Sequence, residues 1–155
     1  MRYLLMLLLC LPSLASALEF DEFTQSLPLG HALQVFEDAA GTATIDEVLA
    51  QSAAGAFKPH DKTTLNAGYS RSAFWLKIDL HYRPANPDAQ RTWLLELAYP
   101  PLDHLDLYLP DAAGMPAPAA RCAGRPDCQG DNAGRFSARR LIASNRRSAW
   151  LCRGV

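Results

Sequence analysis

The sequence predicts a mainly β protein: an antiparallel β-sandwich or jelly roll with one short helix. Residues 72–82, 91–99 and 102–109 each alternate apolar and polar side chains with the period of a β-strand. Proline-containing turns separate these stretches at regular spacing, which favours antiparallel strands over strands alternating with long helices. A single helix-start motif accounts for the one predicted helix.

The chain begins with a predicted secretory signal peptide over residues 1–17. A positive charge at Arg2 precedes an apolar stretch that ends at Leu14, and residues 15–17 read Ala-Ser-Ala, the small-residue motif of a cleavage site. This stretch is shorter than the ~20 apolar residues of a transmembrane helix. We therefore expect cleavage after Ala17 and a periplasmic or otherwise extracytoplasmic product, with an uncleaved anchor as the alternative.

The first elements after the signal peptide are predicted to be a strand, a helix and a loop. Residues 30–36 alternate small or apolar residues with polar ones, which suits an opening strand. Thr44 and Glu47 have the spacing of a capping box, in which each side chain bonds to the backbone N–H of the other residue. A short helix is therefore expected through Ala50, followed by a loop over residues 57–69.

The strongest predicted strand, residues 72–82, carries the candidate binding residues. One face is apolar and consists of Phe74, Leu76, Ile78, Leu80 and Tyr82. The other face holds the predicted ligand-binding residues Trp75, Lys77, Asp79 and His81. An exposed tryptophan among hydrogen-bonding groups is suited to stacking on a sugar ring. The alternative is that both faces are partly buried and Trp75 belongs to the core.

The last part of the chain, residues 111–155, differs in composition from the rest. Residues 18–110 contain 13 acidic and 6 basic residues, whereas residues 111–155 contain 3 acidic and 8 basic residues, all arginine. These arginines lie among Ala, Gly and Pro without interleaved aromatics, so no nucleic-acid partner is predicted. Only residues 135–138 are predicted as a strand here. We expect this tail to be largely disordered or loosely docked, from a truncated or frame-shifted reading.

No catalytic, metal or cofactor site is predicted. Three cysteines follow the signal peptide, and in an oxidising compartment Cys122 and Cys128 can pair across a short loop, which leaves Cys152 free. The histidines are dispersed and none has metal-ligand spacing to a cysteine. No phosphate-binding loop, nucleophile elbow or Cys-x-x-Cys motif occurs, so an enzyme is not expected.

Several segments in order resemble one sensor family. The segments are Leu-Gln-Val-Phe-Glu-Asp at 33–38, Thr-Ile-Asp-Glu-Val at 44–48, Phe57, Ser-Ala-Phe-Trp-Leu-Lys-Ile-Asp-Leu at 72–80, Trp-Leu-Leu-Glu-Leu at 93–97 and Pro-Leu-Asp-His-Leu-Asp-Leu-Tyr at 101–108. Together they resemble the type 2 extracellular domain of bacterial seven-transmembrane receptors with diverse intracellular signalling modules. Lys77 stands where that family usually has arginine, which keeps the charge but loses the planar guanidinium.

The resemblance implies a periplasmic jelly-roll sensor domain, over residues 27–145, that is similar to carbohydrate-binding modules. It also implies a small-molecule or saccharide ligand, and membrane association only through receptor helices that follow such a domain in the family. The function predicted is therefore ligand sensing by a receptor, here cut off before its membrane part. Two alternatives remain at this point: a free-standing secreted carbohydrate-binding or adhesin-like module, and a small secreted hydrolase.

Overall fold

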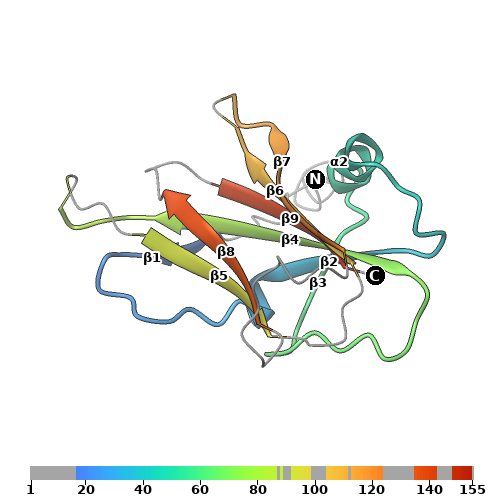
Figure 1. The fold of residues 1–155 in the computed structure, drawn as a ribbon, viewed down its shortest axis with the longest axis horizontal. Coiled ribbons are helices and arrows are strands. Elements are labelled where there is room, and N and C mark those ends of the chain that lie inside the picture. The colour runs from blue at the N-terminus through green and yellow to red at the C-terminus, as the bar shows by residue number, and fades with distance from the viewer. Residues whose placement is uncertain are drawn as a thin grey trace, which may run out of the picture.

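The computed structural model describes residues 17–86, 88, 92–98, 104–111, 113–123, 135–142 and 148–154. The predicted signal peptide, apart from Ala17, lies outside these ranges. The strands form two sheets, and within the described residues there is one α-helix, α2 (Figure 1). The mainly β, sandwich-like fold with a single short helix is confirmed, while the jelly-roll connectivity stays a prediction.

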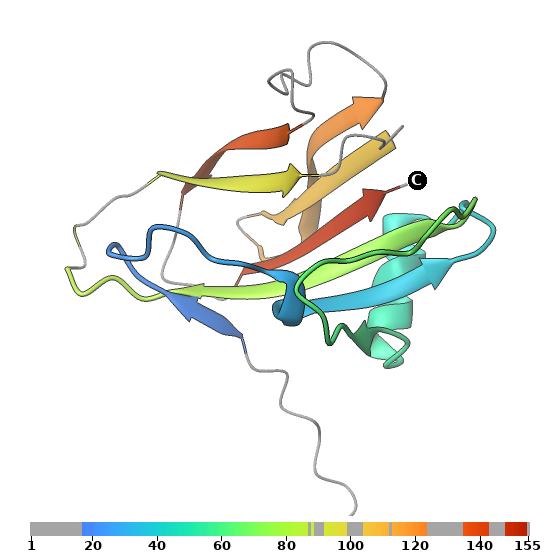
Figure 2. The ribbon, with the colours of Figure 1, turned by 90° about the horizontal axis from the view of Figure 1, so that it is seen from below.

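The larger sheet has the strand order β3-β2-β4-β9-β6-β7, and β1 also pairs with β4. Its strands are β1 (Leu18–Phe20), β2 (Leu33–Asp38), β3 (Lys58–Pro59), β4 (Ala73–Tyr82), β6 (His104–Pro110), β7 (Pro116–Ala123) and β9 (Ser148–Gly154). The pairing is antiparallel except between β1 and β4, which run parallel. The second sheet consists of β5 (Thr92–Ala98) and β8 (Arg135–Ile142), and Figure 2 shows it as a separate layer.

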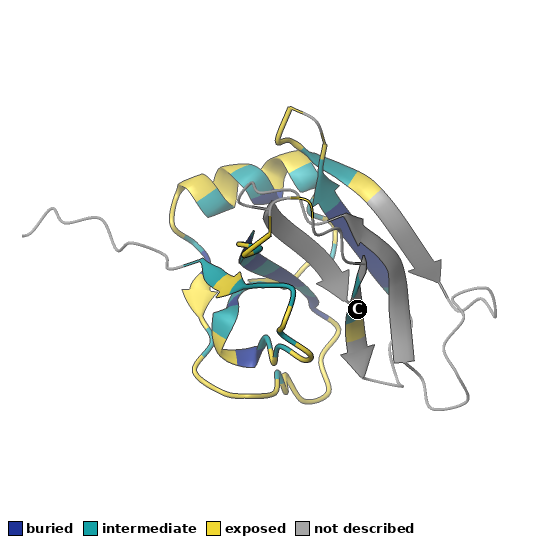
Figure 3. Cartoon of the chain, turned by 90° about the vertical axis from the view of Figure 1, so that its left-hand side faces the viewer, coloured by how far each residue is buried: buried dark blue, intermediate teal, exposed yellow. Residues whose placement is uncertain are grey.

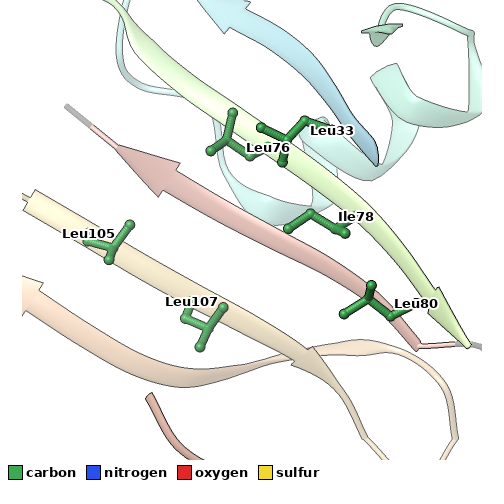
Figure 4. Packing of buried hydrophobic residues seen from close by; sticks show 6 residues of the cluster. All are labelled: Leu33, Leu76, Ile78, Leu80, Leu105 and Leu107. Atoms are coloured by element: carbon green, nitrogen blue, oxygen red, sulfur yellow. The ribbon is translucent and has the colours of Figure 1, made fainter. Parts of the chain in front are cut away.

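The main core lies on the face of the larger sheet that carries the apolar residues of β4. Buried leucine and isoleucine side chains from β2, β4 and β6 form this cluster: Leu33, Leu76, Ile78, Leu80, Leu105 and Leu107 (Figure 4). Leu95 of β5 packs against them, so the cluster fills the space between the two layers. The predicted core face of residues 72–82 is confirmed from Leu76 to Tyr82, where every second residue is buried, whereas Phe74 is only half-buried.

Helix α2 (Ile45–Ala53) begins at the predicted capping box. The Thr44 hydroxyl accepts from the Glu47 backbone N–H at 3.4 Å, and the Glu47 carboxylate accepts from the Thr44 N–H at 2.7 Å. Accepting this backbone hydrogen bond, together with one from the Thr44 hydroxyl, lowers the pKa of Glu47. Val48 is buried on the sheet side, whereas the other side of the helix is exposed (Figure 3).

The prediction that residues 135–138 form the only strand after Pro110 is wrong. Strand β8 is present but longer than predicted, and β7 and β9 were not predicted. Strand β7 contains Pro116 and Pro118, which an edge strand tolerates because one side of its backbone has no strand partner. Strand β9 is central, with β4 on one side and β6 on the other, a position that depends on strand order rather than on a local sequence pattern.

The predicted opening strand begins later than expected, since residues 30–32 form the 3-10 turn η2 (Gly30–Ala32) before β2. The short strands β1 and β3 were also missed.

Two of the cysteines lie on different sides of β6 and are too far apart to form a disulfide. Cys122 of β7 is opposite Leu105, and Cys152 of β9 is opposite Leu107. Two strand spacings separate their backbones by roughly 10 Å, beyond the Cα separation of about 7 Å that a disulfide can span. Cys128 lies outside the described residues, so its pairing with Cys122 stays a prediction.

Candidate ligand-binding face

The second face of β4 holds all the predicted binding residues, but they divide into two environments. Trp75 lies beneath α2 in a second apolar cluster with Val48, Phe57 and Tyr108. Lys77, Asp79 and His81, called the polar strip below, continue along the strand and are half-buried. The structure therefore places these three side chains in a row on one face and separates Trp75 from solvent.

The expectation that Trp75 presents an open ring is corrected by its burial. Its exposed fraction is 0%, and its ring packs against that of Tyr108 with centroids 5.9 Å apart and planes tilted by 32°. The cause is α2, which packs across this face of the sheet and brings Val48 onto the aromatic rings. The alternative interpretation from the sequence, a core tryptophan with both strand faces covered, describes the structure.

Replacement of Trp75 by alanine is therefore expected to weaken folding directly. Removing a fully buried tryptophan leaves a large cavity, and such changes cost about 3–5 kcal/mol of unfolding free energy. Trp75→Phe, which keeps an aromatic ring in the cluster, should cost clearly less. Urea titration measures both. An unchanged midpoint for Trp75→Ala, combined with lost ligand binding, would instead support an open, ligand-stacking ring.

Lys77 joins the polar strip to the C-terminal part of α2. Its Nζ donates to the Ser52 hydroxyl at 3.3 Å, and Ser52 lies in the last turn of the helix. In the ladder with β2, Lys77 is opposite Gln34. Cross-strand partners share a face, so Gln34 extends the hydrogen-bonding capacity of the strip towards β2.

The other end of the polar strip is built from β1 and the residues that follow β4. His81 is opposite Glu19 of β1, and Arg83 Nη2 lies 2.9 Å from Glu19 Oε1. His81 Nδ1 is 3.3 Å from Arg83 Nε and 3.6 Å from Glu19 Oε1. Because the guanidinium has only N–H donors, His81 Nδ1 accepts in the contact with Arg83. Asp79 lies between this group and Lys77.

The segment after β1 is held against the segment after β4 by Glu22. Its carboxylate accepts from the backbone N–H groups of Ala85 at 2.9 Å and Asn86 at 3.1 Å. Hydrogen bonds from its own backbone N–H and from that of Ala85 lower the pKa of Glu22. The polar strip is thus bounded at this end by backbone that is hydrogen-bonded in place.

Asp106 lies on the same face of the larger sheet as the polar strip. Its carboxylate is buried, with a side-chain exposure of 7%. The sequence did not predict this environment. His104 Nε2 lies 3.3 Å from Asp106 Oδ2. The ladders place Asp106 opposite Arg121 of β7 and Arg153 of β9. Two arginines of the basic tail therefore flank an acidic residue of the preceding part of the chain. This arrangement depends on the order of the strands in the sheet, and the periodicity of the sequence does not predict strand order.

Within the described ranges, neither a cluster of metal-ligand side chains nor a membrane-spanning helix is found. No group of three or more His, Cys, Asp or Glu side chains is arranged there to hold a metal ion. No helix in those ranges combines the length and apolar character needed to cross a bilayer. The polar strip has one cation, one carboxylate and one imidazole in a row, all of which are hydrogen-bonding groups.

Comparisons with known proteins give one family. The family model described as 7TMR-DISM extracellular 2 matches residues 30–141. The match begins at η2 and reaches into β8, so it includes β4, α2 and most of the strands around the polar strip. The comparison with curated proteins found no match.

Proposed function

We propose that the polar strip binds a small saccharide. The premise is that the chain belongs to the 7TMR-DISM extracellular 2 family and so to the extracellular sensor domains of seven-transmembrane receptors. We also propose that a signal peptide ends at Ala17 and that the sensor domain extends from residue 27 to residue 145. We assign the chain a binding role and no catalytic role. The location outside the cytoplasm follows from the family.

The observation that supports this site is that three polar residues on the same face of β4 are half-buried. They are every second residue of the strand: Lys77, Asp79 and His81. Here α2 borders the row at one end and Glu19 with Arg83 borders it at the other. Partly desolvated groups in fixed positions are what orients a polar ligand in a binding site.

Ligand binding would act on the receptor by shifting the populations of two conformations. The polar strip joins β1, β4 and the end of α2, so a ligand bound there would favour one arrangement of these elements. A saccharide suits the strip because its hydroxyl groups both donate and accept hydrogen bonds. Asp79 would accept from them, Gln34 would accept or donate, and Lys77 would donate.

Asp79→Ala is expected to weaken saccharide binding roughly 10- to 100-fold, since a hydrogen bond to a charged group contributes about 1.5–3 kcal/mol. Isothermal titration calorimetry with maltotetraose, cellotetraose and chitotetraose provides the measurement. Thermal melts recorded beside it should be nearly unchanged, because Asp79 is not part of either apolar cluster.

Asp46→Ala is the matched control, because Asp46 is an exposed aspartate in the first turn of α2, away from the polar strip. Asp46→Ala should bind the recognised tetrasaccharide with the same affinity as the wild type. Equal affinity of Asp79→Ala and the wild type would place the site elsewhere on the domain. If the folded wild type bound none of the three tetrasaccharides, saccharide recognition itself would be rejected.

A further inference from the structure

A long segment without helix or strand, residues 60–72, connects β3 to β4 and is called the β3–β4 loop below. It is the green segment at the lower right of Figure 1. Irregular loops of this length in a compact domain are commonly functional, and binding residues concentrate on loops that a rigid scaffold positions. The contacts of this loop show how such positioning is achieved here.

The first half of the β3–β4 loop is packed closely against η2 and the core. The His60 backbone N–H donates to the Leu33 carbonyl at 2.9 Å, and His60 Nδ1 donates to the Gly30 carbonyl at 2.9 Å. A Cβ at position 30 would overlap with the Thr63 backbone, so this approach requires glycine. Leu65 packs against the main core cluster.

The second half of the loop is shaped by a local turn and tied to β2. Asn66 Oδ1 accepts from the Gly68 N–H at 3.0 Å, and Gly68 has a φ of 66°, which favours glycine. At the end of the loop, the Ser72 hydroxyl donates to Glu37 Oε1 at 2.7 Å. The loop is therefore held on both sides of residues 66–71.

Between these attachments the loop presents Tyr69, whose exposed fraction is 110%. Within the described part of the chain, the other exposed large hydrophobic residues are Phe23 and Met115. The neighbouring side chains of Asn66 and Arg71 are also exposed. Tyr69 has no packing role, yet the loop around it is fixed, which is the arrangement expected of a contact residue.

We propose that the β3–β4 loop is a saccharide contact of its own and that Tyr69 supplies the stacking ring that the buried Trp75 does not. This inference rests on the proposed function and names a second element that serves it. A tyrosine offers an apolar face to a pyranose ring and a hydroxyl to its edge. Asn66 and Arg71 add hydrogen-bonding groups on either side in the sequence.

The loop contact is separate from the polar strip. Tyr69 precedes the first residue of β4, whereas Asp79 and His81 lie near its last residue. At about 3.3 Å per residue, Ala73 is roughly 13 Å from Lys77 and roughly 20 Å from Asp79 along the strand. Variants at Tyr69 and Asp79 should therefore act independently on a saccharide too short to span this distance.

The test is a calorimetric titration of Tyr69→Ala, Tyr69→Phe and Phe23→Ala with cellohexaose and chitohexaose. Tyr69→Ala should weaken binding of the recognised hexasaccharide roughly three- to tenfold, the range expected for loss of one stacking contact. Tyr69→Phe keeps the ring and should stay within about twofold of the wild type. Phe23→Ala removes another exposed aromatic residue, one with an exposed fraction of 73%, and should bind as the wild type does.

An amide-resolved NMR titration of the unaltered protein with the same hexasaccharide gives an independent readout. The N–H signals of residues 66–71 should shift on binding. If they do not shift and Tyr69→Ala binds normally, while Asp79→Ala loses affinity, the loop inference is overturned and the proposed function stands. If neither hexasaccharide binds the wild type, the loop inference and saccharide recognition are both overturned.

Discussion

Ending the chain at Arg147, so that β9 is removed, is expected to abolish the cooperative thermal transition. Strand β9 pairs with β4 from Phe74 to Leu80 and with β6 from Leu105 to Tyr108. Its loss leaves a gap of roughly 10 Å between two strands that carry most of the buried core. The backbone groups that faced β9 would also lose their partners, and each buried unpaired group costs about 1–3 kcal/mol.

Thermal melts followed by far- and near-ultraviolet circular dichroism provide the measurement. The matched control is a chain that lacks only Val155, the residue after the end of β9. It should melt as the full chain does. A sharp transition at an unchanged temperature in the chain ending at Arg147 would show that β9 is not part of the cooperative unit.

Leu76→Asp should be strongly destabilising, at more than about 4 kcal/mol of unfolding free energy. Leu76 is 9% exposed and belongs to the main core cluster. Its ladder partners are Val35 on β2 and Cys152 on β9, so strands flank it on both sides. An aspartate there either stays charged without a partner or must be protonated.

Urea titration of Leu76→Asp should give a strongly lowered midpoint or a chain that is unfolded without denaturant. Leu76→Met is the control, because it keeps apolar volume and such exchanges usually cost less than about 1.5 kcal/mol. A wild-type midpoint for Leu76→Asp would mean that the even-numbered residues of β4 do not face the core.

Local sequence patterns were sufficient for those elements whose signal is itself local. The alternation in residues 72–82 predicted β4 and its core face because one face is packed between the layers while part of the other meets solvent. Thr44 and Glu47 predicted the start of α2 because a capping box involves only neighbouring residues. The ordered segments from Leu33 to Tyr108 were sufficient to predict the family.

The candidate site was predicted only in part. Lys77, Asp79 and His81 do share one face, as the alternation of a strand requires. The alternation also placed Trp75 on that face, but it contains no information about which helix will cover the face. The exposed Tyr69 lies in a loop, where no apolar–polar alternation predicts which side chains are exposed. Their exposure depends instead on tertiary contacts such as that between Gly30 and Thr63.

The sequence by itself determined the β class, the strand phase of β4 and the start of α2, because each depends on residues close together in the chain. It also determined the receptor family, through the order of several such local segments. Only the tertiary structure decided that Trp75 is core and that β9 is central. It also decided that arginines of the basic tail flank Asp106. These outcomes depend on pairing between residues far apart in the sequence, where the entropy of closing the chain must be offset by burial and backbone hydrogen bonds formed together.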